Sequence, residues 1–474
     1  MNQIKEFLEK IHTHDIRKKI YFDGSEYTYS EILSKSFTVA RKLEKYQTKK
    51  IFFNLKNSPL SICLYLASFI VDIELIVPIN PRLIASELEA ILEPNSLFIT
   101  YPHDSKLAEF CDVNNIEILE IKDEIDFLNN IDDTDNHKIH QKAIIAHVSS
   151  GTAGYYNKHY HNLDQIIKYA NLTKKNLGLF DNEHLLIALS LNHAFAFSYQ
   201  LLPALAMGLD LTIITEFNPK QVSQLVNKSR ITALALLPTM YHHLLKEDIV
   251  NHNLRYLSVA GDVASEDLHK AVEQRFDIKL LNGIGMTELY GYGQNTVPND
   301  NINMVKIFED TEIRIDEFKD SQYGRIFVKN YMLPLNRYDD VNNQSHRNSE
   351  WFETGDIGSF DGKTRELTFY GRYKDIIIKG GSNICPIELE NAILHFDNIK
   401  ACVVVGKADK IWGEIICAFV VGSFCSLNDI NQHLGKHVAK YKQLDRIIQI
   451  DQIPLTSTGK TDRKKLKQIA NNEL

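Results

Sequence analysis

The segment GRYKDIIIKGGSNICPIELE, residues 371–390, separates two parts of the chain whose sequence patterns differ. Before it, TEIRIDEF, GRIFVKN and ELTFYGR alternate polar and apolar residues, which is typical of antiparallel sheet. After it, IELENAILHF and DINQHLGKHVAKY predict helices, and ACVVVGKAD and EIICAFVVG predict strands. The segment itself offers a forked donor, Arg372, and a flexible turn, Gly380–Gly381, that is able to line a narrow channel. We therefore expect one domain at 1–373 and a small α+β domain at 374–474.

The first 300 residues or so alternate apolar, β-branched runs with helical patterns. Helices are expected at 28–46 and 86–93. Strands are expected at 51–55, 75–80, 97–100 and 143–149, and then in LLIALS, LTIIT, ITALALLP and LRYLSVAG. Such alternation predicts parallel sheets covered by helices on both faces. The expected fold class is α/β, with parallel-rich sheets and a small β-barrel-like subdomain in the larger domain.

Composition excludes several classes of protein. A hydrophobic content of 44% and a charged content of 24% predict a globular chain with a sizeable core. The net charge of -8 argues against a nucleic-acid partner. The six cysteines lack metal-ligand or disulfide spacing. The N-terminus has no apolar signal, and the long apolar stretch 60–79 is interrupted by Asp72 and Glu74, so it predicts a buried helix leading into a strand. A cytoplasmic protein without a membrane span is expected.

The stretch SSGTAGYYNK, residues 149–158, has the composition of a phosphate-binding loop. It follows an expected strand, and its glycines let successive N–H groups converge on an anion. It is not a Walker A motif, because its lysine comes four residues after the second glycine. A surface turn with incidental glycines is the alternative. The candidate phosphate contacts are Ser149, Ser150, Gly151, Thr152, Gly154 and Lys158, whose charge is expected to be mobile.

The stretch LNGIGMTE, residues 281–288, combines two glycines, which let a ligand come close to the main chain, with two polar side chains. Gly283 and Gly285 allow a flat ligand to approach the main chain. Thr287 can donate to a phosphate, and Glu288 can hold Mg²⁺ directly or through water. A helix start with a capping Thr and Glu is the alternative interpretation.

Two further turns carry polar groups. In WFETGDIG, residues 351–358, Asp356 can accept both hydroxyls of a ribose diol, although a plain turn between strands also explains the motif. In PLTSTGKTDRKKL, residues 454–466, Lys460 follows a glycine on an exposed turn, and a solvated surface charge is the alternative.

The order and spacing of these motifs resemble the adenylate-forming superfamily, which holds acyl- and aryl-CoA ligases, luciferases and the adenylation domains of nonribosomal peptide synthetases. The series runs SSGTAG, NHAFAF, AGD, GIGMTE, TGD, GRYKDIIIKGGSNICPIELE and STGKTDR, and it spans nearly the whole chain. The resemblance implies two steps: a carboxylate attacks the α-phosphorus of ATP, and a thiol then displaces AMP. The implied small molecules are a carboxylic acid, ATP, Mg²⁺, and CoA or a phosphopantetheine thiol.

Residue roles follow from the matched motif positions. The Ser149–Lys158 loop would hold pyrophosphate, Thr287 the α-phosphate and Glu288 the Mg²⁺. Lys460 would bridge the acid and the α-phosphate, where electrostatic stabilisation dominates. The remaining nucleotide contacts would be Gly261, Gly283, Ile284, Asp356 and Arg372.

The resemblance also implies a rotation of the C-terminal domain between the two steps. The hinge residue would be Lys374. The rotation would withdraw Lys460 and bring in the Gly380–Gly381 turn to guide the thiol. His193 matches a histidine beside the acyl pocket, although a hydrogen-bonded core histidine is the alternative.

Three departures from the family pattern qualify these roles. Ala153 and Asn157 replace Thr and Pro, and the loop is about three residues short. Ile284 replaces an aromatic residue that stacks on adenine, so weaker ATP affinity is expected. Phe195 stands where amino-acid-activating relatives place an Asp, and a buried ammonium without that partner would be costly. With Phe197, it suggests an apolar wall and hence a fatty or aromatic acid.

We therefore predict an ATP-dependent acid–thiol ligase, with CoA as the favoured acceptor. The alternatives are a ligase that loads an acyl or peptidyl carrier protein, and a nucleotide- or acyl-binding pseudoenzyme.

Overall fold

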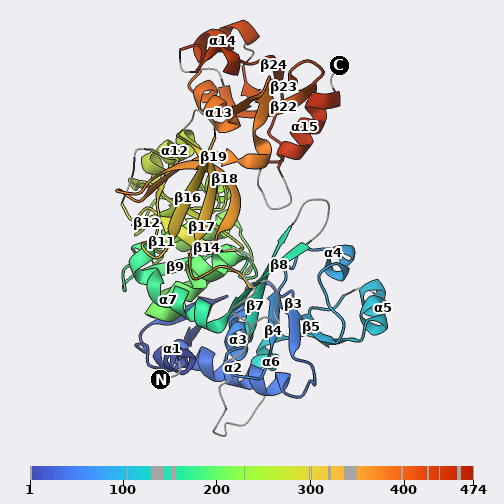
Figure 1. Cartoon of the computed structure of the whole chain (residues 1–474). Helices are drawn as coiled ribbons and strands as arrows, with labels where there is room; N and C mark the ends of the chain where they lie inside the picture. Colours follow the sequence, from blue (N-terminus) through green and yellow to red (C-terminus); the bar gives the residue numbers. More distant parts are fainter. Residues whose placement is uncertain are drawn as a thin grey trace. The chain divides into compact units, whose positions relative to one another are not determined.

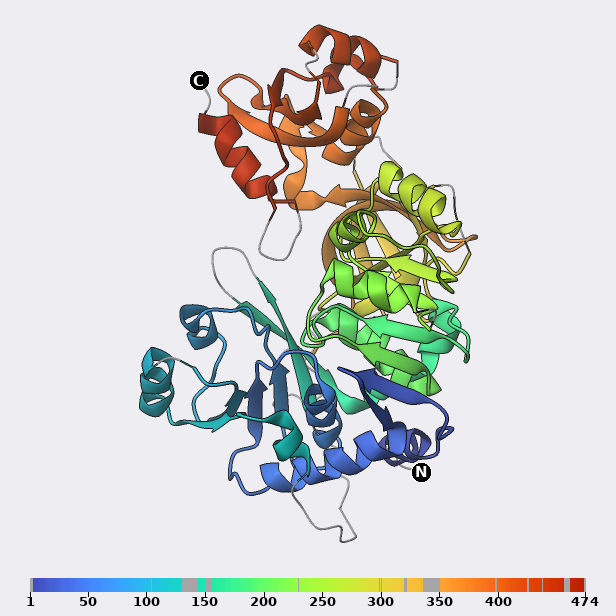
Figure 2. The same cartoon turned by 180° about the vertical axis from the view of Figure 1, so that it is seen from behind.

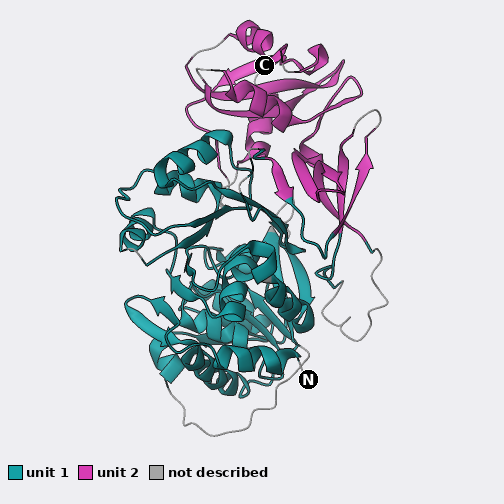
Figure 3. Cartoon of the chain, turned by 90° about the vertical axis from the view of Figure 1, so that its left-hand side faces the viewer, with its two compact units in different colours: residues 1–302, 306–311, 329–350 teal, residues 303–305, 312–328, 351–474 magenta. Residues whose placement is uncertain are grey.

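The computed structural model describes most of the chain in helices, strands and defined turns. The described residues are 3–103, 105–129, 143–150, 156–228, 230–297, 299, 301–318, 322–335, 350–396, 399–423, 426–436, 438–455 and 461–472. They form two compact units, shown in Figure 3. The first contains residues 1–302, 306–311 and 329–350, and the second contains residues 303–305, 312–328 and 351–474.

The first sheet of unit 1 has six strands in the order β6-β5-β3-β4-β7-β8. All neighbours are parallel except β7 and β8, which form an antiparallel hairpin. The strands are β3 (Lys50–Phe53), β4 (Leu75–Pro78), β5 (Ser96–Thr100), β6 (Ile116–Glu120), β7 (Ile144–Ser150) and β8 (Tyr156–Asn162). The accompanying helices are α2 (Tyr29–Leu43), α3 (Pro59–Ala67), α4 (Ala85–Glu89), α5 (Ser105–Val113) and α6 (Glu124–Asn129) (Figure 1).

The second sheet of unit 1 has eight strands in the order β14-β13-β12-β11-β9-β10-β1-β2. Only the end pairs β1–β2 and β13–β14 are antiparallel. The strands are β1 (Lys19–Phe22), β2 (Ser25–Thr28), β9 (His184–Ile187), β10 (Asp210–Ile213), β11 (Ala233–Leu236), β12 (Tyr256–Val259), β13 (Leu281–Met286) and β14 (Tyr290–Gln294). The helices are α1 (Gln3–His12), α7 (Leu163–Leu177), α8 (Ala194–Ala196), the π-helix η2 (Phe197–Leu201), α9 (Leu202–Met207), α10 (Pro219–Asn227), α11 (Pro238–Leu244) and α12 (Glu266–Phe276).

Local sequence explains where these helices begin. Thr28 caps α2 and exchanges hydrogen bonds with Glu31, and Asn162 caps α7 with Gln165 in the same way. Such reciprocal caps satisfy the N–H groups that the first helical turn leaves without partners. The stretch 60–79 does form a buried helix, α3, followed by strand β4, as predicted.

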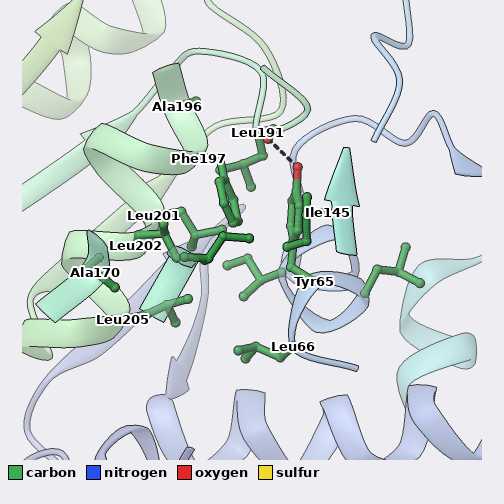
Figure 4. Packing of buried hydrophobic residues seen from close by; sticks show 14 of the residues in the cluster. Tyr65, Leu66, Ile145, Ala170, Leu191, Ala196, Phe197, Leu201, Leu202 and Leu205 are labelled. Carbon is green, nitrogen blue, oxygen red and sulfur yellow. Dashed lines mark hydrogen bonds between the residues drawn. The ribbon is translucent and has the colours of Figure 1, made fainter. Parts of the chain in front are cut away.

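One apolar core joins elements of both sheets of unit 1. It includes Phe53 from the six-stranded sheet and Leu185 from the eight-stranded sheet. At its centre Tyr65 of α3 stacks on Phe197 of the π-helix, with ring centroids 4.5 Å apart. The Tyr65 hydroxyl donates to the Leu191 carbonyl at 2.8 Å (Figure 4). Burial on this scale supplies the main stabilisation of the unit.

Unit 2 contains a five-stranded sheet and a C-terminal α+β segment. The sheet has the order β15-β19-β18-β17-β16, and β18 pairs antiparallel with β17 and β19, which confirms the antiparallel prediction for this region. Its strands are β15 (Met304–Lys306), β16 (Glu312–Glu317), β17 (Gly324–Lys329), β18 (Phe352–Asp361) and β19 (Glu366–Arg372).

The C-terminal segment is built on the long hairpin of β22 and β23, with α15 packed beside β22 (Figures 1 and 2). Its elements are the 3₁₀ helix η5 (Tyr373–Asp375), β20 (Ile377–Lys379), β21 (Ser382–Ile384), α13 (Pro386–Leu394), β22 (Ile399–Asp409), β23 (Gly413–Gly422), α14 (Leu427–Leu434), the 3₁₀ helix η6 (Lys440–Lys442), β24 (Arg446–Gln449) and α15 (Arg463–Asn472). The predicted helix over 429–441 was too long. Helix α14 ends at Leu434, where Gly435, a poor helix former, follows.

Candidate functional site

The hairpin β7–β8 carries the first motif. Ser149 at the end of β7 pairs in register with Asn157, and Ser150 pairs with Tyr156. The Ser149 hydroxyl lies 2.7 Å from Nε2 of His159, so the hairpin holds this side chain in place. Gly151, Thr152 and Gly154 lie outside the described residues, and their phosphate contacts stay predictions.

Lys158 differs from the mobile charge that the sequence suggested. Its ammonium lies 2.5 Å from a carboxylate oxygen of Glu93 and 5.1 Å from the ring centre of Phe52. Burial lowers the pKa of Lys158, against the opposing effect of Glu93. Burial is the largest single influence on the pKa of Glu93 and raises it, but the hydrogen bonds and charges of Lys158 and Lys50 together outweigh burial, so the net shift is downward. To reach a phosphate, Lys158 would first have to leave this ion pair.

Glu288 lies in the turn between β13 and β14 and is held by two histidines of β8. Its carboxylate is 3.3 Å from Nε2 of His159. Its main-chain carbonyl is 2.8 Å from Nε2 of His161. Burial lowers the pKa of both histidines, that of His161 to about 4. The end of the phosphate-loop strand and the expected metal ligand are therefore joined through His159.

The glycines of β13 and β14 leave space that Tyr199 fills. Tyr199 belongs to the π-helix, an element that often marks functional sites. Its hydroxyl lies 3.2 Å from the Ile284 carbonyl and 3.0 Å from the Gly293 carbonyl. A Cβ at Gly291 would overlap the Tyr199 ring, and one at Gly283 would lie 3.3 Å from its hydroxyl. Glycine at these positions is therefore required by side-chain packing.

The segment around His193 follows β9. His193 is exposed and begins α8, where its Nδ1 accepts from the Phe195 N–H at 3.2 Å, so it is not a core histidine. Phe195 meets Tyr199 edge-on at 5.2 Å and lies beside Gly261, whose φ is +87°. Phe197 is only 1% exposed and lies in the core against Tyr65, so Phe195 is the closer of the two to the site glycines.

Unit 2 brings together the two residues expected to bind ribose. Asp356 of β18 lies opposite Arg372 of β19 in the strand register. The Nε of Arg372 is 2.8 Å from a carboxylate oxygen of Asp356, which is 5% exposed. Two residues that the resemblance assigned to the nucleotide therefore lie together, and their contact with ribose stays a prediction.

The proposed hinge and thiol-channel residues lie just beyond this pair. Lys374 is exposed in η5. Gly380 and Gly381 form the tight turn between β20 and β21, with φ of +58° and +81°. These angles belong to the left-handed region that favours glycine. Lys460 lies outside the described residues, and its role stays a prediction.

Sequence reasoning missed His159, Glu93 and Tyr199. The alternation of His147, His159 and His161 with apolar or aromatic residues along the hairpin was the available signal for the first. Within the described part of the chain, no three or more His, Cys, Asp or Glu side chains gather to form a metal site. Among the described helices, none is long and apolar enough to cross a membrane.

Two family matches cover most of the chain. Residues 5–333 match the family described as "AMP-binding enzyme". Residues 388–460 match the family described as "AMP-binding enzyme C-terminal domain".

Relatives and solved structures agree with these matches. A 2-succinylbenzoate–CoA ligase of Staphylococcus aureus (strain MSSA476) is 27% identical over 482 residues, covering 94% of this chain and 96% of the relative. The ATP-bound crystal structure of MatB from Rhodopseudomonas palustris superposes with a TM-score of 0.87 at 20% identity, covering 99% of each chain. The o-succinylbenzoate CoA synthetase MenE of Bacillus subtilis, in complex with its acyl-adenylate intermediate, gives a TM-score of 0.80 at 22% identity, covering 100% of this chain and 99% of the other.

Proposed function

Since this chain belongs to the family of AMP-binding enzymes, we propose how its residues carry out ATP-dependent ligation of an acid to a thiol. The chain is an AMP-forming acid–CoA ligase. In the first step a carboxylate oxygen bonds to the α-phosphorus of ATP, and the bond to pyrophosphate breaks. In the second step the thiol sulfur bonds to the acyl carbon, the bond to AMP breaks and the thiol loses its proton.

One observation carries the residue assignment. Ser149 and Glu288, which are far apart in the sequence, both contact Nε2 of His159. A hydroxyl that suits a phosphate and a carboxylate that suits a cation therefore lie side by side. This juxtaposition supports placing the pyrophosphate of ATP at the end of β7.

Glu288 fits the part of a Mg²⁺ ligand. Mg²⁺ at phosphate sites is held by one or two carboxylates, with phosphate oxygens and waters completing the shell. A single half-buried carboxylate next to a phosphate loop meets this requirement. When bound, the ion would neutralise charge on the phosphates. Thr287, the preceding residue in the same turn, would donate to the α-phosphate.

Asp356 and Arg372 would hold the ribose. The guanidinium fixes one carboxylate oxygen of Asp356, so the carboxylate is oriented before a diol arrives. Lys460 would neutralise the crowded charge between the acid and the α-phosphate. We further propose that the segment beginning at Lys374 rotates as a domain between the two steps, with the Gly380–Gly381 turn guiding the thiol in the second.

The acid is proposed to be aromatic and compact. Phe195 offers an apolar surface beside Gly261, and no carboxylate stands at position 195 to pair an α-ammonium. The Tyr199 ring occupies the space beside the glycines of β13 and β14, which leaves less room for a long chain. The relative from Staphylococcus aureus, whose name specifies an aromatic acid, points the same way.

The test is acid-dependent ATP–pyrophosphate exchange over a panel of benzoates, dicarboxylates and fatty acids. At least one aromatic acid should stimulate exchange strongly, and hexadecanoate should not. Adding CoA or a holo-carrier protein to the preformed adenylate then identifies the acceptor, and CoA is expected to form the thioester. If no acid stimulates exchange above the acid-free rate, the ligase assignment fails in favour of a nucleotide-binding pseudoenzyme.

A further inference from the structure

Tyr290 has a backbone conformation that a bulky side chain rarely adopts. Its φ is +55°, which belongs to the left-handed region. The residue closes the turn of Thr287, Glu288 and Leu289, because it pairs with Met286 at the end of β13. The Leu289 N–H donates to the Met286 carbonyl at 3.3 Å within the same turn. The conformation of Tyr290 therefore sets the direction in which the chain leaves the turn.

A neighbouring glycine makes room for this conformation. A Cβ at Gly285 would lie 2.6 Å from the carbonyl oxygen of Tyr290. Gly285 pairs across the hairpin with Gly291, the residue that follows Tyr290. An unfavourable backbone angle of this kind persists only where the surrounding structure fixes it, and such angles cluster at functional sites.

The side chain of Tyr290 is what the surrounding structure holds. It is 1% exposed, and its hydroxyl lies 3.1 Å from Nδ1 of His147. Four rings from four other elements surround it, with centroids 4.7 to 6.0 Å from its own: His147 of β7, His161 of β8, Tyr169 of α7 and Phe197 of η2. The ring thus anchors the end of the turn in the core of unit 1.

His161 connects this anchor to Glu288. Its ring packs against Tyr290, and its Nε2 lies 2.8 Å from the Glu288 main-chain carbonyl. The turn is therefore held against β8 at Glu288 and again two residues later at Tyr290. A shift of the Tyr290 ring would move the backbone that carries Glu288 and Thr287.

We propose that Tyr290 is a positioning residue for adenylate formation. Its buried ring and its hydroxyl fix the turn so that Thr287 faces the α-phosphate and Glu288 faces the Mg²⁺. The inference rests on the proposed function, in which these two residues have those roles. It concerns the first step, because pyrophosphate, whose charge the ion would help to neutralise, has left before the thiol attacks.

The first test measures the Mg²⁺ requirement of each variant. In Tyr290→Phe, which loses only the hydroxyl, the Mg²⁺ concentration for half-maximal pyrophosphate exchange should rise about 2- to 10-fold, the effect of one neutral hydrogen bond. In Tyr290→Leu, which also loses the ring, it should rise about 10- to 100-fold, as for loss of a group that orients a metal ligand. Thioester formation from preformed acyl-adenylate and CoA should stay within about threefold of the unmutated rate in both variants.

Tyr241→Phe and Tyr241→Leu are the matched controls. Tyr241 of α11 is also fully buried, and its hydroxyl donates to the Ser258 carbonyl at 3.0 Å. These variants should lose thermal stability, as those at position 290 do, but keep the unmutated Mg²⁺ requirement. A rise in the Mg²⁺ requirement at both positions would mean that general loosening of the fold explains the effect, and the inference would fail.

The other outcomes are also distinct. An unchanged Mg²⁺ requirement in Tyr290→Phe would overturn the proposal, whether or not Tyr290→Leu folds. Equal slowing of both half-reactions would mean that Tyr290 only supports the fold. If the unmutated enzyme shows no acid-dependent exchange, the proposed function itself is at fault, and the binding measurement below then decides the role of Tyr290 separately.

That second readout does not depend on turnover. An ATP analogue with a methylene group between the α- and β-phosphorus is titrated calorimetrically into each variant, with Mg²⁺ and with EDTA. The loss of affinity at position 290 should be larger with Mg²⁺ than with EDTA, because Glu288 acts through the ion. Equal losses under the two conditions would contradict the proposal.

Discussion

Nε2 of His159 lies 3.3 Å from the carboxylate of Glu288, and the contact joins the β7–β8 hairpin of the six-stranded sheet to the β13–β14 turn of the eight-stranded sheet. His161, two residues further along β8, holds the main-chain carbonyl of the same glutamate. One strand therefore fixes both the side chain and the backbone of the proposed Mg²⁺ ligand. Loss of a group that orients a metal ligand in this way typically weakens metal binding.

Substitution of His159 tests this contact. His159→Gln should weaken Mg²⁺ binding about 10- to 100-fold, because Glu288 loses a partner that orients it. The measurements are the Mg²⁺ dependence of pyrophosphate exchange and calorimetric ATP binding at several Mg²⁺ concentrations. His14→Gln is the control, because it removes a different partly buried histidine, one whose Nε2 contacts the Leu205 carbonyl and not Glu288. An unaltered Mg²⁺ dependence in His159→Gln would show that the contact is only structural.

Ile284 should limit ATP affinity. Base stacking on an aromatic side chain contributes about 1–3 kcal/mol, and an aliphatic contact recovers only part of this. Ile284→Tyr should therefore lower the dissociation constant for ATP about fivefold or more, provided that the larger ring clears Gly293 and Ile307, which border this position. The check is calorimetric titration with ATP, and thermal melting of the variant shows whether the ring fits. A well-folded variant whose affinity for ATP is unchanged would show that the lack of an aromatic residue at position 284 does not limit ATP binding.

Substitution of the proposed hinge residue should affect the two half-reactions differently. Lys374 is exposed in the short helix η5, and a proline there fixes φ and restricts the preceding residue. Lys374→Pro should leave pyrophosphate exchange within about threefold of the unmutated rate, while thioester formation from the adenylate should slow about tenfold or more. Lys374→Ala, which removes only the charge, should retain both steps. Equal slowing of the two steps in Lys374→Pro would argue against a rotation about this residue.

His184 should make stability depend on pH. Burial lowers the pKa of His184 from an ordinary value of 6.5 to about 4. At a pH between these two values, the side chain is neutral in the folded chain and takes up a proton when the chain unfolds. A histidine whose pKa is lowered by folding contributes its full share of stability above pH 6.5. This contribution to the free energy of unfolding is lost as the pH falls toward 4. Between pH 7 and pH 5 the loss from this residue is about 2 kcal/mol. Denaturant unfolding of the unmutated chain and of His184→Asn at both pH values checks this, and the variant should lose less stability on acidification. Identical losses would contradict the assignment.

Much of the fold follows from local sequence pattern. The apolar runs that predicted strands at 75–80 and 97–100 form β4 and β5, and period-2 alternation correctly predicted the antiparallel strands β16, β17 and β19. The segment 351–358 was expected to be a turn, and this was wrong, because it lies largely within the long strand β18. The family resemblance assigned Asp356 and Arg372 to one nucleotide, and the structure adds that they lie opposite each other on consecutive strands of one antiparallel pair. Such features depend on residues that are near one another in sequence.

Long-range contacts were not predictable in the same way. Lys158 forms an ion pair with Glu93, which comes from a distant part of the chain, and no sequence motif indicates that the two residues are paired. His159 and Tyr199 likewise act through partners that only the packing of the two sheets brings near. The helix predicted over 429–441 was too long because the apolar periodicity of the sequence continues past Gly435, whereas α14 ends at Leu434.

The most direct test of the central claim is a comparison of the two half-reactions in Lys460→Ala. The account predicts that acid-dependent ATP–pyrophosphate exchange falls by about 10²–10³-fold, as for loss of one preorganised donor at a developing charge. Thioester formation from preformed acyl-adenylate and CoA should stay within about threefold of the unmutated rate. Full pyrophosphate exchange in Lys460→Ala would contradict the claim that this lysine neutralises the charge at the α-phosphate.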